Sequence, residues 1–325
     1  MLLLNQQEIL RSVTLEQVMD QVEEAYRIVD RGDFQMPDRL TVEHQGNTFC
    51  YMPCLHGDTA AVKILSLSPK NPARGLPYIR GIMLLSDGDS GQTLALLDGG
   101  FLTALRTGAV GGVGMRHFSR PDCHSVGVVG AGTQGFYQAL YACHARDIQQ
   151  IYLLDRRPVE DAYVQRLRDT LAAYGKAPQI TVCANDRELL EHSDIVVTAT
   201  TSAQPVLSDD ENLLRGKCFV GVGSARPDMR ELPDAIWPLV ERVYVEDPFA
   251  CQERGDLALP LANGLLEMDR VAYIGALLNG PAHALPKAGE TTFFKSVGIG
   301  VLDLCVSQLI YQRAVELGLG QTVDL

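Results

Sequence analysis

Three glycines with the spacing of a nucleotide-binding turn stand near the middle of the chain. Gly130, Gly132 and Gly135 form a GxGxxG run that follows the apolar stretch 126–129 and leads into a helical pattern. The first glycine permits a tight turn, the second lets backbone N–H groups approach a pyrophosphate, and the third lets helix and strand pack closely. The start of the following helix adds partial positive charge. Because a strand precedes the run and a helix follows it, the run predicts a dinucleotide-binding site.

An acidic residue marks the end of the next predicted strand. Asp155 comes 20 positions after Gly135, where a carboxylate would accept hydrogen bonds from the ribose hydroxyls of NAD and repel the 2′-phosphate of NADP. Arg156 and Arg157 follow directly, and their guanidinium groups suit that phosphate. Asp155 favours NAD as the cofactor, and the two arginines keep NADP open.

Three cations stand in settings that are unusual for charged side chains. Lys63 lies in the apolar run AAVKILSL, Arg106 lies in the small-residue run LTALRTGA, and Arg39 follows Met-Pro-Asp. A buried cation is costly unless it is paired, so each of them implies an anion nearby. One interpretation is an internal ion pair that only stabilises the fold. The other is a site at which the three cations bind the carboxylate of a substrate.

The composition excludes several classes of partner. The 325 residues carry 28 Lys+Arg and 40 Asp+Glu, a net charge of −12, whereas nucleic-acid-binding proteins carry a cationic surface. The N-terminus lacks the basic flank and apolar core of a signal peptide, and no apolar run reaches the length of a membrane span. The eight cysteines have no spacing typical of a metal site, which predicts reduced thiols in a cytoplasmic protein without a bound metal. We therefore expect a small-molecule substrate, with neither nucleic acid nor membrane as partner.

The first third of the chain has its own pattern. Residues 13–31 have helical periodicity, with Thr14 and Gln17 as a capping box and Gly32 as a stop signal. From 34 to 100, short β-like runs follow one another without intervening helices. This order predicts an amphipathic helix followed by an antiparallel or mixed sheet.

The rest of the chain alternates. A helical run at 101–118, with Thr103 and Thr107 as start signals, precedes strands that alternate with helices from about residue 120. That alternation predicts a parallel sheet covered on both faces, the doubly wound α/β arrangement. An apolar helix is predicted over 296–318, ending at Gly318.

Four motifs carry a resemblance to a known family. In chain order, LTALRTGAV, GVVGAGTQG, GVGSARPDMREL and TTFFKSVGIGVLD are similar to segments of the ornithine cyclodeaminase/mu-crystallin family, and the resemblance covers essentially the whole chain. It implies an α/β fold with a Rossmann doubly wound parallel sheet plus a discontinuous α+β substrate-binding and dimerisation domain. The implied bounds are 1–119 with 298–325 for the substrate domain and 120–297 for the Rossmann domain. The resemblance also implies a homodimer.

The resemblance also assigns roles to individual residues. The family's substrate-carboxylate positions fall on Arg39, Lys63 and Arg106, of which Lys63 and Arg106 are the catalytic candidates. The position that approaches the nicotinamide falls on Ser296, for the substrate, and Val297, for the cofactor. The family's cofactor contacts fall on Thr133, Gln134 and Asp155, in addition to the glycines and the two arginines that the sequence itself indicates.

One departure separates this chain from the deaminating members of the family. The cyclodeaminases it resembles carry an aspartate in a GGD-type motif followed by Pro-Gly-Lys, and a glutamate earlier in the chain. Ala225, Met229 and Cys50 stand in the places of the aspartate, the lysine and the glutamate. An alanine cannot transfer a proton, and the loss of such a group lowers a rate by about 10²–10⁴-fold. Cyclodeamination is therefore disfavoured.

The motif GSARPDMREL resembles that of mu-crystallin-type ketimine reductases and their bacterial relatives. It implies an NAD(P)H-dependent oxidoreductase that reduces a cyclic ketimino acid, either 1-pyrroline-2-carboxylate to L-proline or 1-piperideine-2-carboxylate to L-pipecolate. The alternatives are an ornithine or lysine cyclodeaminase, an open-chain imino-acid reductase or alanine dehydrogenase, and a dinucleotide-gated binding protein without activity. Within this motif, Asp228 is either a shifted catalytic acid or a structural partner of Arg226 or Arg230.

Overall fold

The chain forms two compact units in the computed structural model, which describes residues 1–224, 226, 228–253 and 255–324. The first unit comprises Met1–Arg106 and Gly298–Leu325, and the second comprises Thr107–Val297. The domain bounds that the sequence suggests, 1–119 with 298–325 and 120–297, stay a prediction. They differ from the two units at the first boundary, which lies inside a helix.

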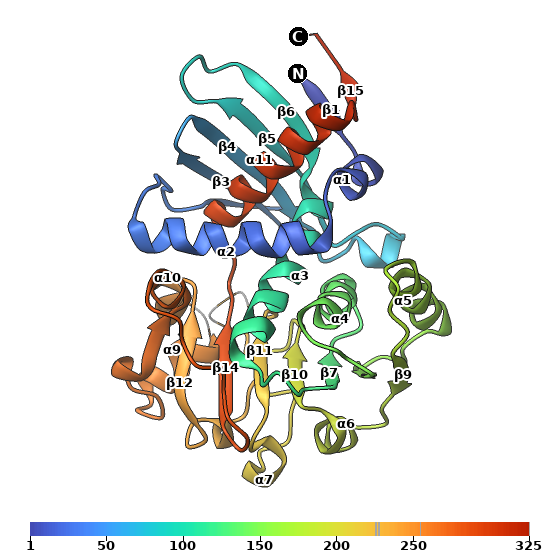
Figure 1. The fold of residues 1–325 in the computed structure, drawn as a ribbon, viewed down its shortest axis with the longest axis vertical. Helices are drawn as coiled ribbons and strands as arrows, with labels where there is room; N and C mark the ends of the chain where they lie inside the picture. Colours follow the sequence, from blue (N-terminus) through green and yellow to red (C-terminus); the bar gives the residue numbers. More distant parts are fainter. Residues whose placement is uncertain (225, 227, 254, 325) are drawn as a thin grey trace. The chain divides into compact units, whose positions relative to one another are not determined.

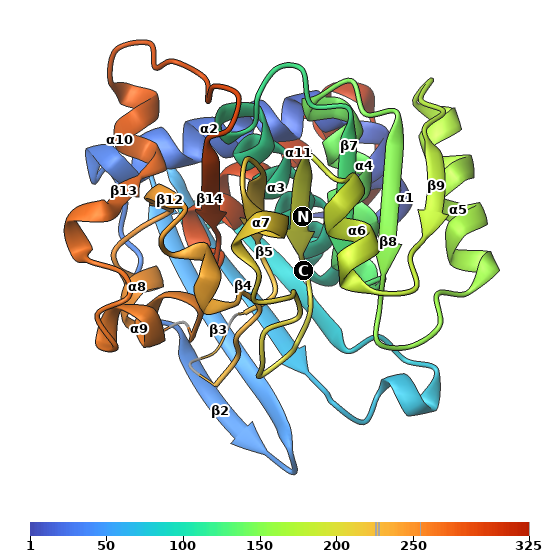
Figure 2. The same cartoon turned by 90° about the horizontal axis from the view of Figure 1, so that it is seen from below.

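The first unit is built on a mixed seven-stranded sheet, as the short runs between 34 and 100 predict. The strands lie in the order β15-β1-β6-β5-β4-β3-β2, in which β1 pairs with β6 in parallel and all other pairs are antiparallel. Figure 2 shows β2 to β5 as long neighbouring ribbons. The strands are β1 (Leu2–Leu4), β2 (Leu40–His44), β3 (Asn47–His56), β4 (Thr59–Leu67), β5 (Ile79–Asp87), β6 (Thr93–Asp98) and β15 (Gln321–Thr322), with a short 3-10 turn at Pro72–Arg74 between β4 and β5.

Helices from both ends of the chain pack on this sheet. The predicted first helix is α2 (Leu15–Arg31), with a capping box at Thr14 and a left-handed C-cap at Gly32. It packs against α11 (Gly300–Leu317), which also contacts β3, β4 and β5 (Figure 1). A shorter helix, α1 (Gln6–Ser12), also contacts α11. The segment that follows the second unit in sequence thus completes the core of the first.

The helix α3 (Gly99–Phe118) begins earlier than its sequence suggests. Asp98 Oδ1 accepts a hydrogen bond from the Phe101 backbone N–H at 2.9 Å, so the aspartate supplies the N-terminal acceptor. Thr103 and Thr107 lie inside the helix, and the prediction that they start it is wrong. Thr103 Oγ1 instead donates to the Gly99 carbonyl at 2.7 Å, a bond within the helix that leaves the hydroxyl no capping role.

The second unit is a doubly wound α/β domain, as predicted. Its eight strands lie in the order β13-β12-β14-β11-β10-β7-β8-β9, and every pair is parallel. The chain order reverses between β7 and β10, and ligands of such sheets bind beyond the carboxyl ends of the strands at this switch point. The strands are β7 (Ser125–Val129), β8 (Gln150–Leu154), β9 (Gln179–Val182), β10 (Ile195–Thr198), β11 (Cys218–Gly221), β12 (Val240–Val245), β13 (Val271–Tyr273) and β14 (Thr291–Lys295).

The helices of the second unit connect these strands around a buried core that includes Trp237. Within the described part of the chain, no helix is both long and apolar enough to cross a membrane. The helices are α4 (Thr133–Ala145), α5 (Asp161–Ala173), α6 (Asp186–His192), α7 (Glu211–Leu214), α8 (Phe249–Glu253), α9 (Gly255–Ala262) and α10 (Ile274–Asn279), with 3-10 turns at Asp234–Ile236 and Met268–Arg270.

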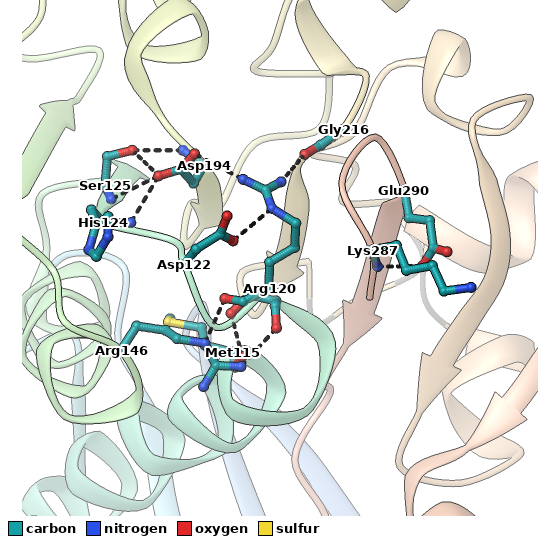
Figure 3. A network of polar contacts seen from close by, with 11 residues as sticks. Met115, Arg120, Asp122, His124, Ser125, Arg146, Asp194, Gly216, Lys287 and Glu290 are labelled. Carbon is teal, nitrogen blue, oxygen red and sulfur yellow. Dashed lines mark hydrogen bonds and ion pairs between the residues drawn. The ribbon is translucent and has the colours of Figure 1, made fainter. Parts of the chain in front are cut away.

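A polar network fixes the amino-terminal edge of this parallel sheet (Figure 3). Asp194 accepts hydrogen bonds from His124 N at 3.0 Å, Ser125 N at 3.1 Å and Ser125 Oγ at 2.7 Å. Arg120 Nη2 lies 3.5 Å from Asp194, and Nη1 of the same guanidinium donates to the Gly216 carbonyl at 3.0 Å. The network therefore ties together the starts of β7, β10 and β11.

Candidate active site

The glycine turn after β7 has the geometry that each glycine predicts. Gly130 has a φ of +107°, and a Cβ there would lie 2.6 Å from the Ala199 carbonyl oxygen. A Cβ at Gly135 would lie 1.9 Å from the Gly130 carbonyl oxygen, so the helix could not pack this closely with any side chain. Around Gly132 nothing lies within 4 Å of a Cβ position, and no side chain caps the first turn of α4. The N–H groups at this helix start therefore suit a pyrophosphate.

Asp155 joins this turn to the end of β8. Its Oδ2 accepts from Ala131 N and its Oδ1 accepts from Arg157 N, each at 2.9 Å. The side chains of Arg156 and Arg157 are exposed. Gln134 Oε1 is buried and has no hydrogen-bond partner among the described residues, and such an orphan acceptor suits a donor on a bound ligand. Both observations fit a dinucleotide at this turn.

In the first unit, one carboxylate brings two of the predicted cations together. Lys63, from β4, forms an ion pair with Oδ2 of Asp303, from α11. Arg106, from α3, donates from Nε to Oδ1 of the same carboxylate at 2.9 Å. All three side chains are buried, with exposed fractions of 1%, 1% and 7% for Lys63, Asp303 and Arg106. Asp303 is the internal anion that the first interpretation of these cations requires.

Burial and mutual charge set the protonation of this cluster. Burial lowers the pKa of Lys63 to about 8, helped by Arg106 and Arg39 and opposed by Asp303. Burial works to raise the pKa of Asp303, but Arg106 and Lys63 outweigh it, and the pKa lies below its ordinary value. The aspartate is therefore ionised while Lys63 titrates near the alkaline end of the physiological range.

The third predicted cation lies beside the same cluster. Arg39 Nη2 is 3.4 Å from the carbonyl oxygen of Gly298, and Arg39 is near enough to lower the pKa of Lys63. Gly298 also contacts Arg106: its φ is +73°, and a Cβ there would lie 2.8 Å from Arg106 Nη1. The structure thus gathers Arg39, Lys63 and Arg106 around the segment 298–303.

The two residues predicted near the nicotinamide lie in the second unit, at the carboxyl end of β14. Ser296 Oγ donates to Glu246 Oε1 at 2.7 Å, and Val297 N donates to Glu246 Oε2 at 2.9 Å. Glu246 is buried at the carboxyl end of β12, beside β14. Because all strands here are parallel, Ser296, Gly130 and Asp155 lie at the same edge of the sheet.

A second buried charge network lies at this edge. Glu231 accepts from the backbone N–H groups of Thr200, at 2.7 Å, and Gly223, at 3.0 Å. Asp256 accepts from the Glu231 N–H at 2.7 Å, and Lys295 Nζ lies 3.1 Å from its other oxygen. Burial, and then Asp256, raise the pKa of Glu231 against the opposing charge of Lys295. The network fastens the loop after β11 to the end of β10.

The motif that separates the family's subclasses is partly described. Ala225, on which the argument against cyclodeamination depends, lies outside the described residues. Met229, in the place of the lysine, is buried. Asp228 forms an exposed ion pair with Arg226 at 3.2 Å, the structural use that the sequence allowed. Arg230 instead pairs with Asp234.

The cysteines are structural in this fold. All eight are buried thiols without disulfide partners, Cys50 and Cys54 among them. Burial, and next to it Asp303, raise the pKa of Cys54 to about 12, so this thiol stays protonated. Across the described ranges, no group of three or more His, Cys, Asp or Glu side chains is placed to hold a metal ion.

Sequence reasoning missed the acidic partners. Asp303, Glu246, Glu231 and Asp256 are all buried, and none was singled out from the sequence. A signal existed for Asp303, because one acid stands in the otherwise apolar helical run GVLDLCV. A buried acid in such a run requires a cation, just as Lys63 requires an anion.

Known proteins resemble this chain over most of its length. A Delta(1)-pyrroline-2-carboxylate reductase of Bacillus cereus is 35% identical over 292 residues, which cover 88% of this chain and 87% of the relative. The structure of the Thermococcus litoralis Delta(1)-pyrroline-2-carboxylate reductase in complex with NADH and L-proline has a TM-score of 0.89 and 30% identity, covering 99% of this chain and 100% of that one. An archaeal alanine dehydrogenase dimer with bound NAD has a TM-score of 0.87 and 26% identity, covering 100% and 99%.

These likenesses confirm the predicted α/β Rossmann fold and the prediction of an NAD(P)-dependent oxidoreductase that acts on carbon–nitrogen bonds. The profile of the ornithine cyclodeaminase/mu-crystallin family matches residues 1–318. The chain belongs to the ornithine cyclodeaminase/mu-crystallin family.

Proposed function

We propose that this protein reduces a cyclic ketimino acid with NAD(P)H, converting 1-pyrroline-2-carboxylate to L-proline or 1-piperideine-2-carboxylate to L-pipecolate. The observation that carries the proposal is the buried group of Lys63, Arg106 and Asp303, in which two cations share one anion. A net positive charge in a buried place suits a substrate carboxylate. The relatives named pyrroline-2-carboxylate reductases support the choice of ring and reaction.

The chain's residues divide the work. The ammonium of Lys63 and the guanidinium of Arg106 bind the substrate carboxylate, with Arg39 beside them, and so fix the orientation of the ring. Gly130, Gly132 and Gly135, with the N–H groups of Thr133 and Gln134, would hold the cofactor phosphates; in its reduced form the bound dinucleotide supplies a hydride. Glu246 fixes Ser296 and Val297, and we assign Ser296 to the substrate and Val297 to the cofactor.

A protonated cyclic imine makes few further demands on the protein. The hydride brings two electrons to the α-carbon, the C=N π electrons move onto nitrogen, and the ring nitrogen keeps its proton as an amine. No ammonia is lost and no ring is closed, so no carboxylate is needed for proton transfer at the place of Ala225. This is why we propose reduction and not cyclodeamination.

The cofactor proposed is NAD. Both oxygens of Asp155 accept backbone N–H groups, which holds its negative charge at the end of β8, where a 2′-phosphate would be repelled. Arg156 and Arg157 are exposed next to it and keep NADP as the second candidate.

We also propose a homodimer. Residues paired across neighbouring strands point to the same face of a sheet, and one such row is Leu40, Tyr51, Ile64 and Ile82. Leu40 is 61% and Ile82 is 40% exposed, which is unusual for an apolar row. A second copy covering this face would bury it, and sedimentation of Leu40→Glu would then show a loss of dimer. The cytoplasm is the proposed compartment, and the eight cysteines without disulfide partners support it.

Steady-state assays test the function directly. The substrates 1-pyrroline-2-carboxylate, 1-piperideine-2-carboxylate and pyruvate with ammonia are each assayed with NADH or NADPH. L-Ornithine is assayed with the oxidised form of either cofactor. We expect kcat/KM for one cyclic ketimine to exceed that for the open-chain mixture by about 10²-fold or more. Ammonia release from L-ornithine at a comparable rate would indicate a cyclodeaminase. Tight binding of cofactor and ketimine without turnover would indicate a binding protein.

A further inference from the structure

The carboxylate of Asp303 sits where three distant parts of the first unit meet. It lies on α11, and its partner Lys63 is 240 positions away in the chain, on β4. Arg106 comes from α3 and contacts the other oxygen at 2.9 Å. The side chain of Asp303 is only 1% exposed, so these two cations, and not solvent, surround its carboxylate oxygens.

The cluster carries more positive than negative charge, and its cations have more N–H donors than Asp303 accepts hydrogen bonds from. An ammonium has three N–H donors and a guanidinium five, and Asp303 accepts one hydrogen bond from each group. The cluster keeps one positive charge more than it has negative charge, before Arg39 is counted. An ion pair that only stabilised the fold would need one cation for one anion. The excess favours a second anion, and a substrate carboxylate is one.

Asp303 also keeps the lysine charged. Burial, Arg106 and Arg39 lower the pKa of Lys63, and Asp303 raises it through its charge and its hydrogen bond. Cys54, on the neighbouring strand, is a protonated thiol and adds no charge. Without Asp303, a buried lysine whose pKa two arginines also lower would lose its proton at a lower pH.

The turn before α11 arranges the arginines. Gly298 has its backbone against the Arg106 guanidinium, and its carbonyl oxygen is 3.4 Å from Arg39 Nη2. The segment 298–303 therefore contacts all three cations, through its backbone at one end and through Asp303 at the other. Such an arrangement fixes the cations before any substrate binds.

We infer that Asp303 is a positioning residue for the proposed reaction: it holds the Lys63 ammonium and the Arg106 guanidinium side by side and charged, as a preformed receptor for the substrate carboxylate. The inference rests on the proposed function, because it takes the ketimino acid as the second anion. Asp303 itself touches no reacting atom and acts only through the two cations.

The test compares Asp303→Asn with Ser307→Ala, which alters another buried polar side chain of α11 whose hydroxyl bonds within the helix. For Asp303→Asn we expect kcat/KM for the cyclic ketimine to fall about 10²-fold, mainly through KM, because two charge-assisted contacts are weakened. The alkaline limb of kcat/KM should move to lower pH, since Lys63 then loses its proton more easily. The substrate titrates in the same way in the assays of both variants, so its pKa does not contribute to the difference between their pH profiles. Ser307→Ala should keep the wild-type pH profile.

Two further measurements keep the inference separate from the proposed function and from misfolding. Binding of pyrrole-2-carboxylate, followed by calorimetry, should be about 10²-fold weaker in Asp303→Asn. Gly298→Ala, which keeps Asp303 but crowds Arg106, should raise KM about tenfold without moving the pH limb. An unchanged pH limb or unchanged probe affinity in folded Asp303→Asn would overturn the inference. Wild-type protein that binds the probe but reduces no ketimine would overturn the proposed substrate while leaving Asp303 as the organiser of a carboxylate site.

Discussion

Asp194 in the second unit and Asp303 in the first each gather several donors around one carboxylate, but the donors differ in kind. Asp194 accepts from two backbone N–H groups and from the Ser125 hydroxyl, with Arg120 at 3.5 Å (Figure 3). Asp303 accepts from the side chains of Lys63 and Arg106. For both, the pKa lies below its ordinary value although burial opposes this.

The kind of donor decides what each carboxylate can do. A backbone N–H has one hydrogen, and once Asp194 accepts it, that group has no other hydrogen to give a ligand. An ammonium or a guanidinium has several, so Lys63 and Arg106 can bind a second anion while Asp303 holds them. The positions agree, because Asp194 lies at the amino-terminal edge of its parallel sheet, away from the edge at which such sheets bind ligands.

The largest effect is expected from removing a cation beside Asp303. Lys63→Met should lower kcat/KM for the cyclic ketimine about 10³-fold, because a charge-assisted contact with the substrate carboxylate is lost. NADH affinity, measured by fluorescence titration, should stay within about twofold, since the glycine turn belongs to the other unit. Lys70→Met, at an exposed lysine of the same unit, should have wild-type kinetics. Wild-type efficiency in Lys63→Met would place the substrate carboxylate elsewhere.

A smaller effect, on stability alone, is expected at Asp194. Because its pKa is lowered by folding, its carboxylate stabilises the native state above the ordinary aspartate pKa of about 3.9, and this stabilisation is lost as the pH falls through the lower folded value. At neutral pH, Asp194→Asn should lower the free energy of unfolding by about 2 kcal/mol, because the hydrogen bonds that N–H groups donate to a charged carboxylate are weakened or lost. The stabilities of the two proteins should converge as the pH falls below the ordinary aspartate pKa and through the lower folded value.

Trp237, the one tryptophan of the chain, makes this measurement specific. It is buried in the core of the second unit, which contains Asp194, so its fluorescence in urea reports the unfolding of that unit. Asp122→Asn is the matched control, because the exposed Asp122 carboxylate also contacts Arg120, at 3.0 Å, and should change stability by about 0.5 kcal/mol or less. If Asp194→Asn lowered kcat/KM but left the free energy of unfolding unchanged, Asp194 would act in binding as Asp303 does. The proposed difference between the two carboxylates would then be wrong.

The sequence predicts best those features that depend on near neighbours. The capping box of Thr14 with Gln17, the stop at Gly32 and the turn at Gly130 are each set by residues within a few positions, and the structure has all of them. The start of α3 shows the limit of such reasoning. Two threonines inside the helix imitate a cap, whereas the nearby Asp98 supplies it.

The sequence predicts least where a residue's partner is distant in the chain. The run around Lys63 shows that an anion is needed but cannot name one 240 positions away. The role of Glu246 is hidden in the same way, because β12 and β14 become neighbours only when the sheet forms. The apolar runs around Lys63 and Arg106 mark the cations in the sequence, and only the fold shows the carboxylate that holds them.

The smallest effect is expected at Asp155, which combines features of Asp194 and Asp303. Like Asp194 it accepts two backbone N–H groups, those of Ala131 and Arg157, but it follows β8 at the carboxyl edge, where ligands bind. In Asp155→Asn the amide nitrogen must face one of these donors, which loosens the glycine turn. We expect the NADH dissociation constant to rise about tenfold and that of NADPH to rise less, since repulsion of the 2′-phosphate is also removed.

Fluorescence titration of both cofactors, with Asp161→Asn on the exposed start of α5 as control, checks this expectation. If Asp155→Asn lowered the stability but left both cofactor affinities unchanged, Asp155 would only stabilise the backbone through its hydrogen bonds, as Asp194 does. If the ratio of NADH to NADPH affinity changed, Asp155 would take part in ligand binding, as we propose for Asp303. In that case the edge of the sheet on which a carboxylate stands, and not the kind of donor alone, determines whether it takes part in binding.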